Sequence, residues 1–96
     1  MAGSVKVAIT YCAECGYEQQ TLDLAKDLMI EFQHSLSGIE LIPWFEGSFE
    51  VSVGGEVVHS MYRDGGFADH SIVKQAVRDR LNQTRSAFIP LTPEGI

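Results

Sequence analysis

The sequence predicts an α/β (α+β) domain with the element order β-α-β-β-α, in which helices pack against a mixed four-stranded sheet. Three observations predict it: a β-branched run followed by an amphipathic helical pattern, two alternating runs joined by a Gly-Gly pair, and a second amphipathic pattern. The 96 residues are enough for a single domain over 1–96, with a core over 5–85 and an apolar, proline-containing tail over 86–96.

In the first half of the chain, the spacing of apolar residues changes from the alternation of a strand to the spacing of a helix and back to a strand. Alternating β-branched residues predict a mostly buried strand over Val5–Tyr11. Helical spacing then predicts a helix from about Cys15 to His34, ended by Ser37-Gly38. Its expected buried stripe is Leu22, Ala25, Leu28, Met29, Phe32 and Leu36. The next run, Ile39–Ile42, predicts a short strand that Pro43 ends and that lies parallel to the first strand.

A β-hairpin is predicted in the second half. The alternating runs Phe49–Val53 and Glu56–Met61 are joined by Gly54-Gly55, and two residues that accept positive φ between such runs are a strong hairpin signal. The turn predicts two cross-strand pairs: Val51 with Val58, and Glu50 with His59.

A loop over 62–68 and a second helix, capped by Asp69 or Ser71, are expected after the hairpin. The expected buried stripe of this helix is Ile72, Val73, Ala76, Val77 and Leu81. The run from Ala87 to Pro93 is not expected to be helical. Because that tail is apolar, we expect it to pack on the domain or on a second subunit, so a homodimer is one predicted arrangement.

Charge and hydropathy exclude two classes of partner. The net charge is −6, whereas nucleic acids and anionic membranes both require a basic face. No apolar run approaches the ~20 residues of a spanning helix.

The start of the chain leads directly into a charged strand without the apolar segment of a signal peptide, so a cytoplasmic location is expected. In a reducing cytosol, paired cysteines are more often catalytic or metal-binding than structural.

The only two cysteines, Cys12 and Cys15, lie where the first strand gives way to the helix. A C-x-x-C at this junction is typical of the thioredoxin-like core and predicts thiol–disulfide chemistry. The helix N-terminus stabilises a thiolate and lowers a thiol pKa from about 8.5 into the range ~3.5–7.5. Glu14, between the sulfurs, disfavours the thiolate. By thioredoxin logic, Cys12 is the more exposed sulfur and attacks, and Cys15 resolves the mixed disulfide.

The titratable residues allow other interpretations. Zinc needs four ligands, but there is no second C-x-x-C, and His34, His59 and His70 form no H-x-x-H pair, so no metal site is predicted. Buried cysteines also behave as small inert hydrophobes. His59 is the candidate base, although a surface histidine opposite Glu50 is more often a simple cross-strand pair.

Aromatic residues fall at the expected strand ends and loops. Trp44 and Phe45 indicate an exposed apolar contact surface. Tyr11, Tyr17 and Phe67 are candidates for contact with a partner, and core packing is an equal alternative for Phe67.

Several pieces of the sequence together resemble the selenoprotein W branch of the Rdx family, which also includes selenoproteins T and H. They span most of residues 5–80, in the family's order, and leave the tail from about Ser86 uncovered. The pieces are Tyr11-Cys12-x-x-Cys15-Gly16-Tyr17, Gly47-x-Phe49-Glu50-Val51-x-Val53-x-Gly55, Val58-His59-Ser60, Arg63, and Gly65-Gly66-Phe67-x-Asp69.

The resemblance implies a small thioredoxin-like redox protein of the cytosol that acts on protein thiols or glutathione, with glutathione as a co-substrate and no other cofactor. In selenocysteine-containing relatives, selenium occupies the second position of the motif. This implies that Cys15 is the reactive sulfur and Cys12 the resolving one, the reverse of the thioredoxin order. Gly47-Ser48 stands where thioredoxins carry a cis-proline that faces the motif, and Pro43 lies several residues earlier. The residues expected to support the pair or contact a partner are Tyr11, Glu14, Gly16, Tyr17, Ser48, His59 and Phe67.

The alternative function is a non-enzymatic, redox-sensitive protein-interaction module. Its aromatic loops and apolar tail would bind a partner, and the cysteines would modulate that binding.

Overall fold

The computed structural model describes residues 5–88, with side chains through residue 83. The strands are β1 (Val5–Cys12), β2 (Leu36–Trp44), β3 (Phe49–Val53) and β4 (Glu56–Ser60). The helices are α1 (Glu18–Phe32), the short 3-10 helix η1 (Gln33–Ser35), α2 (Met61–Asp64) and α3 (His70–Phe88). The three strands β2, β3 and β4 lie between the two long helices, whereas the order β-α-β-β-α has two strands there. The difference arises because the hairpin consists of two strands, β3 and β4, which follow β2.

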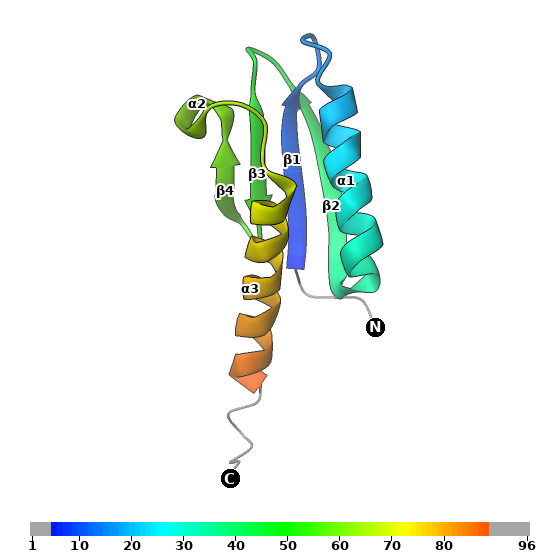
Figure 1. Cartoon of the computed structure of the whole chain (residues 1–96), viewed down its shortest axis with the longest axis vertical. Coiled ribbons are helices and arrows are strands. Elements are labelled where there is room, and N and C mark those ends of the chain that lie inside the picture. Colours follow the sequence, from blue (N-terminus) through cyan, green and yellow to red (C-terminus); the bar gives the residue numbers. More distant parts are fainter. Residues whose placement is uncertain (1–4, 89–96) are drawn as a thin grey trace.

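The four strands form one mixed sheet in the order β2-β1-β3-β4, which confirms the expected sheet. β1 runs parallel to β2 and antiparallel to β3, and β4 pairs antiparallel with β3 at the edge. Both long helices lie on the same side of this sheet (Figure 1). β1 is therefore an interior strand, and the loop that carries the cysteines leaves from its carboxyl end.

The two faces of the sheet have different chemistry. The face toward the helices holds the core, whose fully buried side chains include Val7, Ile9, Phe49 and Val51 of the strands, Leu24 and Leu28 of α1, and Val73 and Val77 of α3. No described helix covers the opposite face, which we call the open face. Because side chains alternate along a strand, the open face carries Lys6, Ala8 and Thr10 of β1 and Glu50 and Ser52 of β3.

The first helix is shorter than the sequence predicts. It begins at Glu18 rather than near Cys15, and it ends at Phe32, where Gln33 takes a positive φ of 49°. The Ser37-Gly38 pair does not end the helix, because β2 has already begun at Leu36.

The buried stripes of both helices are narrower than expected. Leu22 and Met29 of α1 are 54% and 60% exposed, and Ile72 of α3 is 59% exposed. The helices rest on one sheet with water on their outer sides, so only one row of side chains on each is fully enclosed. Thr21 takes the place of Leu22 in the interior because its hydroxyl donates to the Tyr17 carbonyl, 2.9 Å away.

Pro43 does not stop the second strand. β2 continues through it to Trp44, and Pro43 lies opposite Tyr11 in the parallel ladder. A proline fits here because β2 is an edge strand, where the missing N–H costs no ladder hydrogen bond.

A bulge shifts the register of the hairpin. The Gly54-Gly55 turn forms, with φ of 60° and 88°, but the ladder is irregular between Val51 and Ser52. Val51 therefore lies opposite His59, and Glu50 lies opposite Ser60, so both predicted cross-strand pairs are wrong. One extra residue on a strand turns every later side chain to the other face.

The second half closes with a short and a long helix. The expected loop over 62–68 begins as α2. Asp69 caps α3, because its Oδ1 accepts the Ser71 N–H at 2.9 Å. The helix continues through Ala87 and Phe88, so the prediction that the tail is non-helical from Ala87 is wrong there. The rest of the tail lies outside the described residues. Within the described part, no helix is long and apolar enough to span a membrane.

Substitutions at neighbouring positions of α1 test this packing. Leu28 is 0% exposed and Met29 is 60% exposed. We expect Leu28→Ala to lower the free energy of unfolding by about 2–5 kcal/mol, because it leaves a cavity in the core. Met29→Ala is expected to change it by about 0.5 kcal/mol or less. Urea unfolding followed by circular dichroism measures both, and equal losses would contradict the observed orientation of α1.

Candidate redox site

Cys12 and Cys15 are joined in a disulfide, with their Cα atoms 5.3 Å apart. Cys12 is the last residue of β1, and residues 13–17 form the turn that leads into α1. The Cys12 carbonyl accepts the Cys15 and Tyr17 N–H groups at 3.4 and 3.5 Å, which folds the turn back over the end of the strand. Gly16 has a φ of 79°, a conformation that favours glycine, so the turn cannot continue as a helix from Cys15.

Backbone hydrogen bonds anchor the motif to both neighbouring strands. The Cys12 N–H donates to the Ser48 carbonyl at 2.8 Å, and the Ala13 N–H donates to the Trp44 carbonyl at 3.0 Å. The predicted supporting residue Ser48 thus faces the motif through its main chain. These bonds fix Cys12 between the end of β2 and the start of β3.

The two sulfurs differ in their access to solvent. Cys12 is 0% exposed, whereas Cys15 lies on the exposed turn. The expectation that Cys12 is the more accessible cysteine is therefore wrong. Cys12 lies at the end of β1, and the turn over residues 13–17 folds back over it.

The helix dipole acts on the motif from farther away than expected. α1 begins at Glu18, so neither cysteine lies in its first turn. The influence of a helix terminus falls off within about one turn, so it is weaker at Cys15 than at a helical N-terminal residue.

Glu14 lies on the exposed part of the turn between the sulfurs. Its Oε2 accepts the Glu46 N–H at 3.4 Å, which joins the turn to the loop after β2. Glu46 itself has a positive φ of 62°. The carboxylate therefore has a structural contact in addition to its proximity to the cysteines.

An aromatic row connects the motif to the hairpin. The Tyr17 ring meets the Phe67 ring edge to face at 4.9 Å, and Phe67 meets Phe49 in the same way at 5.1 Å. Tyr11 packs against the same core cluster from β1. Phe67, at 40% exposed, is both a core contact and accessible to a partner.

His59 is buried, not a surface residue opposite Glu50. The bulge turns it toward the core, where its Nε2 lies 2.8 Å from the Gly66 carbonyl oxygen. A carbonyl only accepts, so Nε2 carries a proton and donates it. Nδ1 lies 3.7 Å from Asp64 Oδ2. These contacts hold the α2 region against the hairpin, which supports a positioning role for His59.

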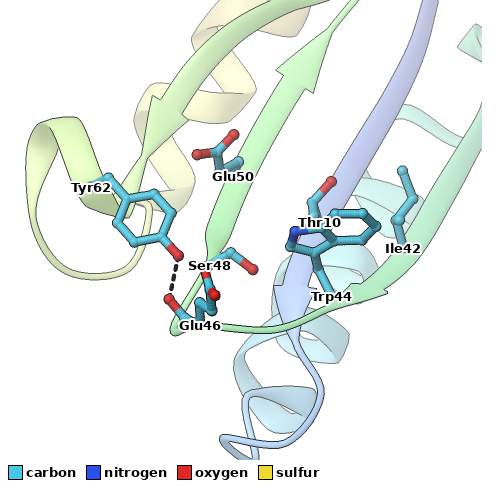
Figure 2. A pocket seen from close by; sticks show the side chains of 7 residues that line it. All are labelled: Thr10, Ile42, Trp44, Glu46, Ser48, Glu50 and Tyr62. Atoms are coloured by element: carbon cyan, nitrogen blue, oxygen red, sulfur yellow. Dashed lines mark hydrogen bonds between the residues drawn. The ribbon is translucent and has the colours of Figure 1, made fainter.

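A pocket of about 550 Å³ opens on the open face beside the motif. Its base follows the strands, since Thr10 pairs with Ile42 on one side and with Glu50 on the other. Figure 2 shows Trp44 at one side of the pocket and Tyr62 at the other, with the Tyr62 hydroxyl donating to the Glu46 carbonyl. Of the lining residues, the sequence points to Ser48 as a supporting residue and to Trp44 as part of an exposed contact surface. It does not bring the lining together as one pocket, although the polar face of β1 and β3 is visible in their alternation.

Among the residues that the structure describes, no group of three or more His, Cys, Asp or Glu side chains could hold a metal ion. Zinc coordination by the cysteine pair would therefore need ligands from elsewhere.

The fold and the disulfide define a thioredoxin-like domain with a C-x-x-C centre at the end of an interior strand. Three comparisons with known proteins agree with this class. The model of the Rdx family matches residues 6–79, and the chain belongs to the Rdx family.

Relatives and solved structures show the same likeness. The chain is 37% identical to mouse selenoprotein W over 67 residues, which cover 69% of this chain and 76% of that protein. It is 33% identical to mouse "Migration and invasion enhancer 1" over 84 residues, covering 84% and 70%. The crystal structure of a selenoprotein W-related protein from Vibrio cholerae superposes with a TM-score of 0.78 at 26% identity, covering 82% of this chain and 99% of that one.

Asp64 offers a pH test of the α2 region. Hydrogen bonds from the Arg63 side chain and then from the Ser60 N–H hold its pKa at about 2, below the ordinary value of 3.8. Because the folded pKa is depressed, its contribution to stability is present above 3.8 and is lost as the pH falls toward about 2. Carbon-13 NMR of the Asp64 carboxyl should show this low titration, and Asp64→Asn should unfold with less pH dependence in that range. Titration near 3.8 would contradict the contacts.

Proposed function

We propose that this protein is a small thiol–disulfide redox protein that uses Cys15 as the attacking sulfur and Cys12 as the resolving sulfur. The observation that carries the proposal is the unequal exposure of a bonded pair: Cys15 is accessible, and Cys12 is 0% exposed. An outside disulfide can reach only the accessible sulfur, whereas the enclosed one has only its neighbour to attack.

In the proposed cycle, the Cys15 thiolate attacks one sulfur of a substrate disulfide and displaces the other as a thiolate. The Cys12 thiolate then attacks the Cys15 sulfur, which releases the second substrate thiol and leaves the Cys12–Cys15 disulfide. Two electrons have moved to the substrate. Two molecules of glutathione return the pair to its dithiol form and become glutathione disulfide.

The substrates that we propose are protein thiols and disulfides, with glutathione as a co-substrate. The exposed position of Cys15 supports access by a polypeptide as well as by a small thiol. We also propose a cytosolic location, because a dithiol that must be re-reduced works in a compartment with a glutathione pool.

Single cysteine variants test the assignment of roles. Cys12→Ser leaves the accessible sulfur without a resolver, so it should accumulate a stable mixed disulfide with glutathione after treatment with glutathione disulfide. Cys15→Ser leaves only the enclosed sulfur and should form the adduct about tenfold more slowly or worse. Mass spectrometry of the native proteins measures both rates. Equal or faster trapping on Cys15→Ser would overturn the assignment.

Glu14 should tune the reduced pair. Glu14→Gln removes a negative charge between the sulfurs and should speed alkylation of Cys15 by iodoacetamide at neutral pH about two- to fivefold, because the thiolate becomes more populated. Glu56→Gln is the matched control, since it makes the same charge change at the hairpin turn, at the opposite end of the sheet. No difference between the two variants would show that Glu14 does not act on the thiolate.

A further inference from the structure

We propose that the pocket on the open face binds the lysine or arginine side chain of a polypeptide whose cysteine reacts with Cys15. The inference rests on the proposed function and gives it a substrate class: thiols or disulfides in basic sequence. The occupant is inferred from the charge of the pocket, its aromatic wall, one unpartnered polar atom and its position beside the motif.

Two carboxylates give the pocket a negative charge. Glu46 and Glu50 both line it, and neither forms an ion pair with another described residue. Arg63 acts on Glu50 electrostatically, but two hydrogen bonds of 2.8 Å hold its guanidinium on Asp64. Glu50 Oε2 also accepts the Ser60 hydroxyl at 2.9 Å, a neutral donor that leaves the negative charge in place. A cation is therefore the ligand that these two carboxylates select, and anionic ligands are repelled.

The walls of the pocket suit a cation on a long apolar stem. Trp44 is 54% exposed at one side, and tryptophan is the best face for a cation–π contact. Ile42 next to it offers apolar surface to the methylene groups of a lysine or arginine. At about 550 Å³, the pocket has the size of an ordinary ligand site and has room for a side chain with part of its backbone.

One buried polar atom in the lining has no partner. Ser48 is 3% exposed, and its Oγ makes no hydrogen bond within the structure. Figure 2 shows this hydroxyl between the Glu46 and Trp44 sides of the pocket. A buried hydroxyl without a partner is costly, so the site is incomplete without a donor or acceptor from a ligand. A guanidinium, with five N–H donors, supplies one.

Residues that line the pocket are hydrogen-bonded to the turn that carries the cysteines. Ser48 and Trp44 accept the backbone N–H groups of Cys12 and Ala13, and Glu14 contacts the Glu46 N–H. A polypeptide joined to Cys15 can therefore lie beside the pocket as it leaves the motif. A basic residue near its cysteine reaches the carboxylates without any rearrangement of the sheet.

Direct binding is measured with the oxidised wild-type protein. The chain contains one tryptophan, so its fluorescence reports on the pocket without interference. Acetyl-arginine amide should give a saturable change with an affinity about threefold or more above that of acetyl-citrulline amide, which has the same shape without the charge. The difference should shrink with added salt, because exposed charges are screened. Equal responses, or none, would overturn the proposal.

The reaction itself is tested with Cys12→Ser protein and short peptides whose cysteine is a disulfide with thionitrobenzoate. The Cys15 thiolate attacks the peptide sulfur, a new disulfide forms, and the coloured thionitrobenzoate leaves with the electron pair. Arginine is placed one to four residues from the cysteine, and each peptide has a citrulline twin. We expect the best arginine peptide to react about three- to tenfold faster than its twin.

Pocket variants are compared by the rate for the arginine peptide divided by the rate for its citrulline twin. This ratio is unaffected by a change in the reactivity of Cys15. Glu46→Gln, Glu50→Gln and Trp44→Leu should each bring the ratio toward one. Glu40→Gln is the matched control, because Glu40 is paired with Lys6 at 2.9 Å, outside the pocket, and its ratio should stay at the wild-type value. Equal rates for all twins in the parent protein would overturn the pocket assignment and leave the proposed function intact. No reaction with any peptide would overturn both.

Discussion

The position of Cys12 depends on the hydrogen bonding of β1 on both of its sides. The strand pairs with β2 as far as Trp44 and with β3 as far as Phe49, and the Ser48 carbonyl extends the contact by one more bond. The motif is consequently built on the most constrained strand of the sheet. A thiol at such a place has its geometry set by the backbone and not by its own side-chain freedom.

The placement of both helices on one face divides the sheet into a structural and a chemical side. Core side chains such as Val51 fill the helix side, while polar side chains such as Thr10, Glu50 and Ser52 take alternate positions on the open face. Thr10 and Glu50 occupy the base of the pocket because they are cross-strand neighbours on the uncovered side. The same alternation that builds the core therefore supplies the lining of a candidate binding site, at no cost to packing.

The sequence predicts the positions of the four strands, the mixed sheet and the location of the C-x-x-C motif. Hydrophobic alternation and turn residues indicate these features directly. Predictions from the sequence are wrong where a single local backbone conformation ends a helix or changes the face to which a side chain points. The positive φ of Gln33 ended α1 early, and the bulge near Val51 turned His59 inward. The relative exposure of Cys12 and Cys15 does not follow from the local pattern either, because burial at the end of a strand depends on neighbouring segments more than 30 residues away in the chain. The pocket depends on register between three strands, which local patterns do not contain.

The enclosure of Cys12 also bears on damage by oxidants. If Cys15 is the reactive sulfur, as proposed, a peroxide that reaches it converts it to a sulfenic acid, and further oxidation of that acid to the sulfinic form is irreversible without a dedicated repair enzyme. Cys12, inaccessible to the same peroxide and with its Cα only 5.3 Å from that of Cys15, is kept as a thiol until the sulfenic acid appears beside it. Condensation of the two then yields the recoverable disulfide and water. With the proposed roles, the buried cysteine would protect Cys15 against overoxidation.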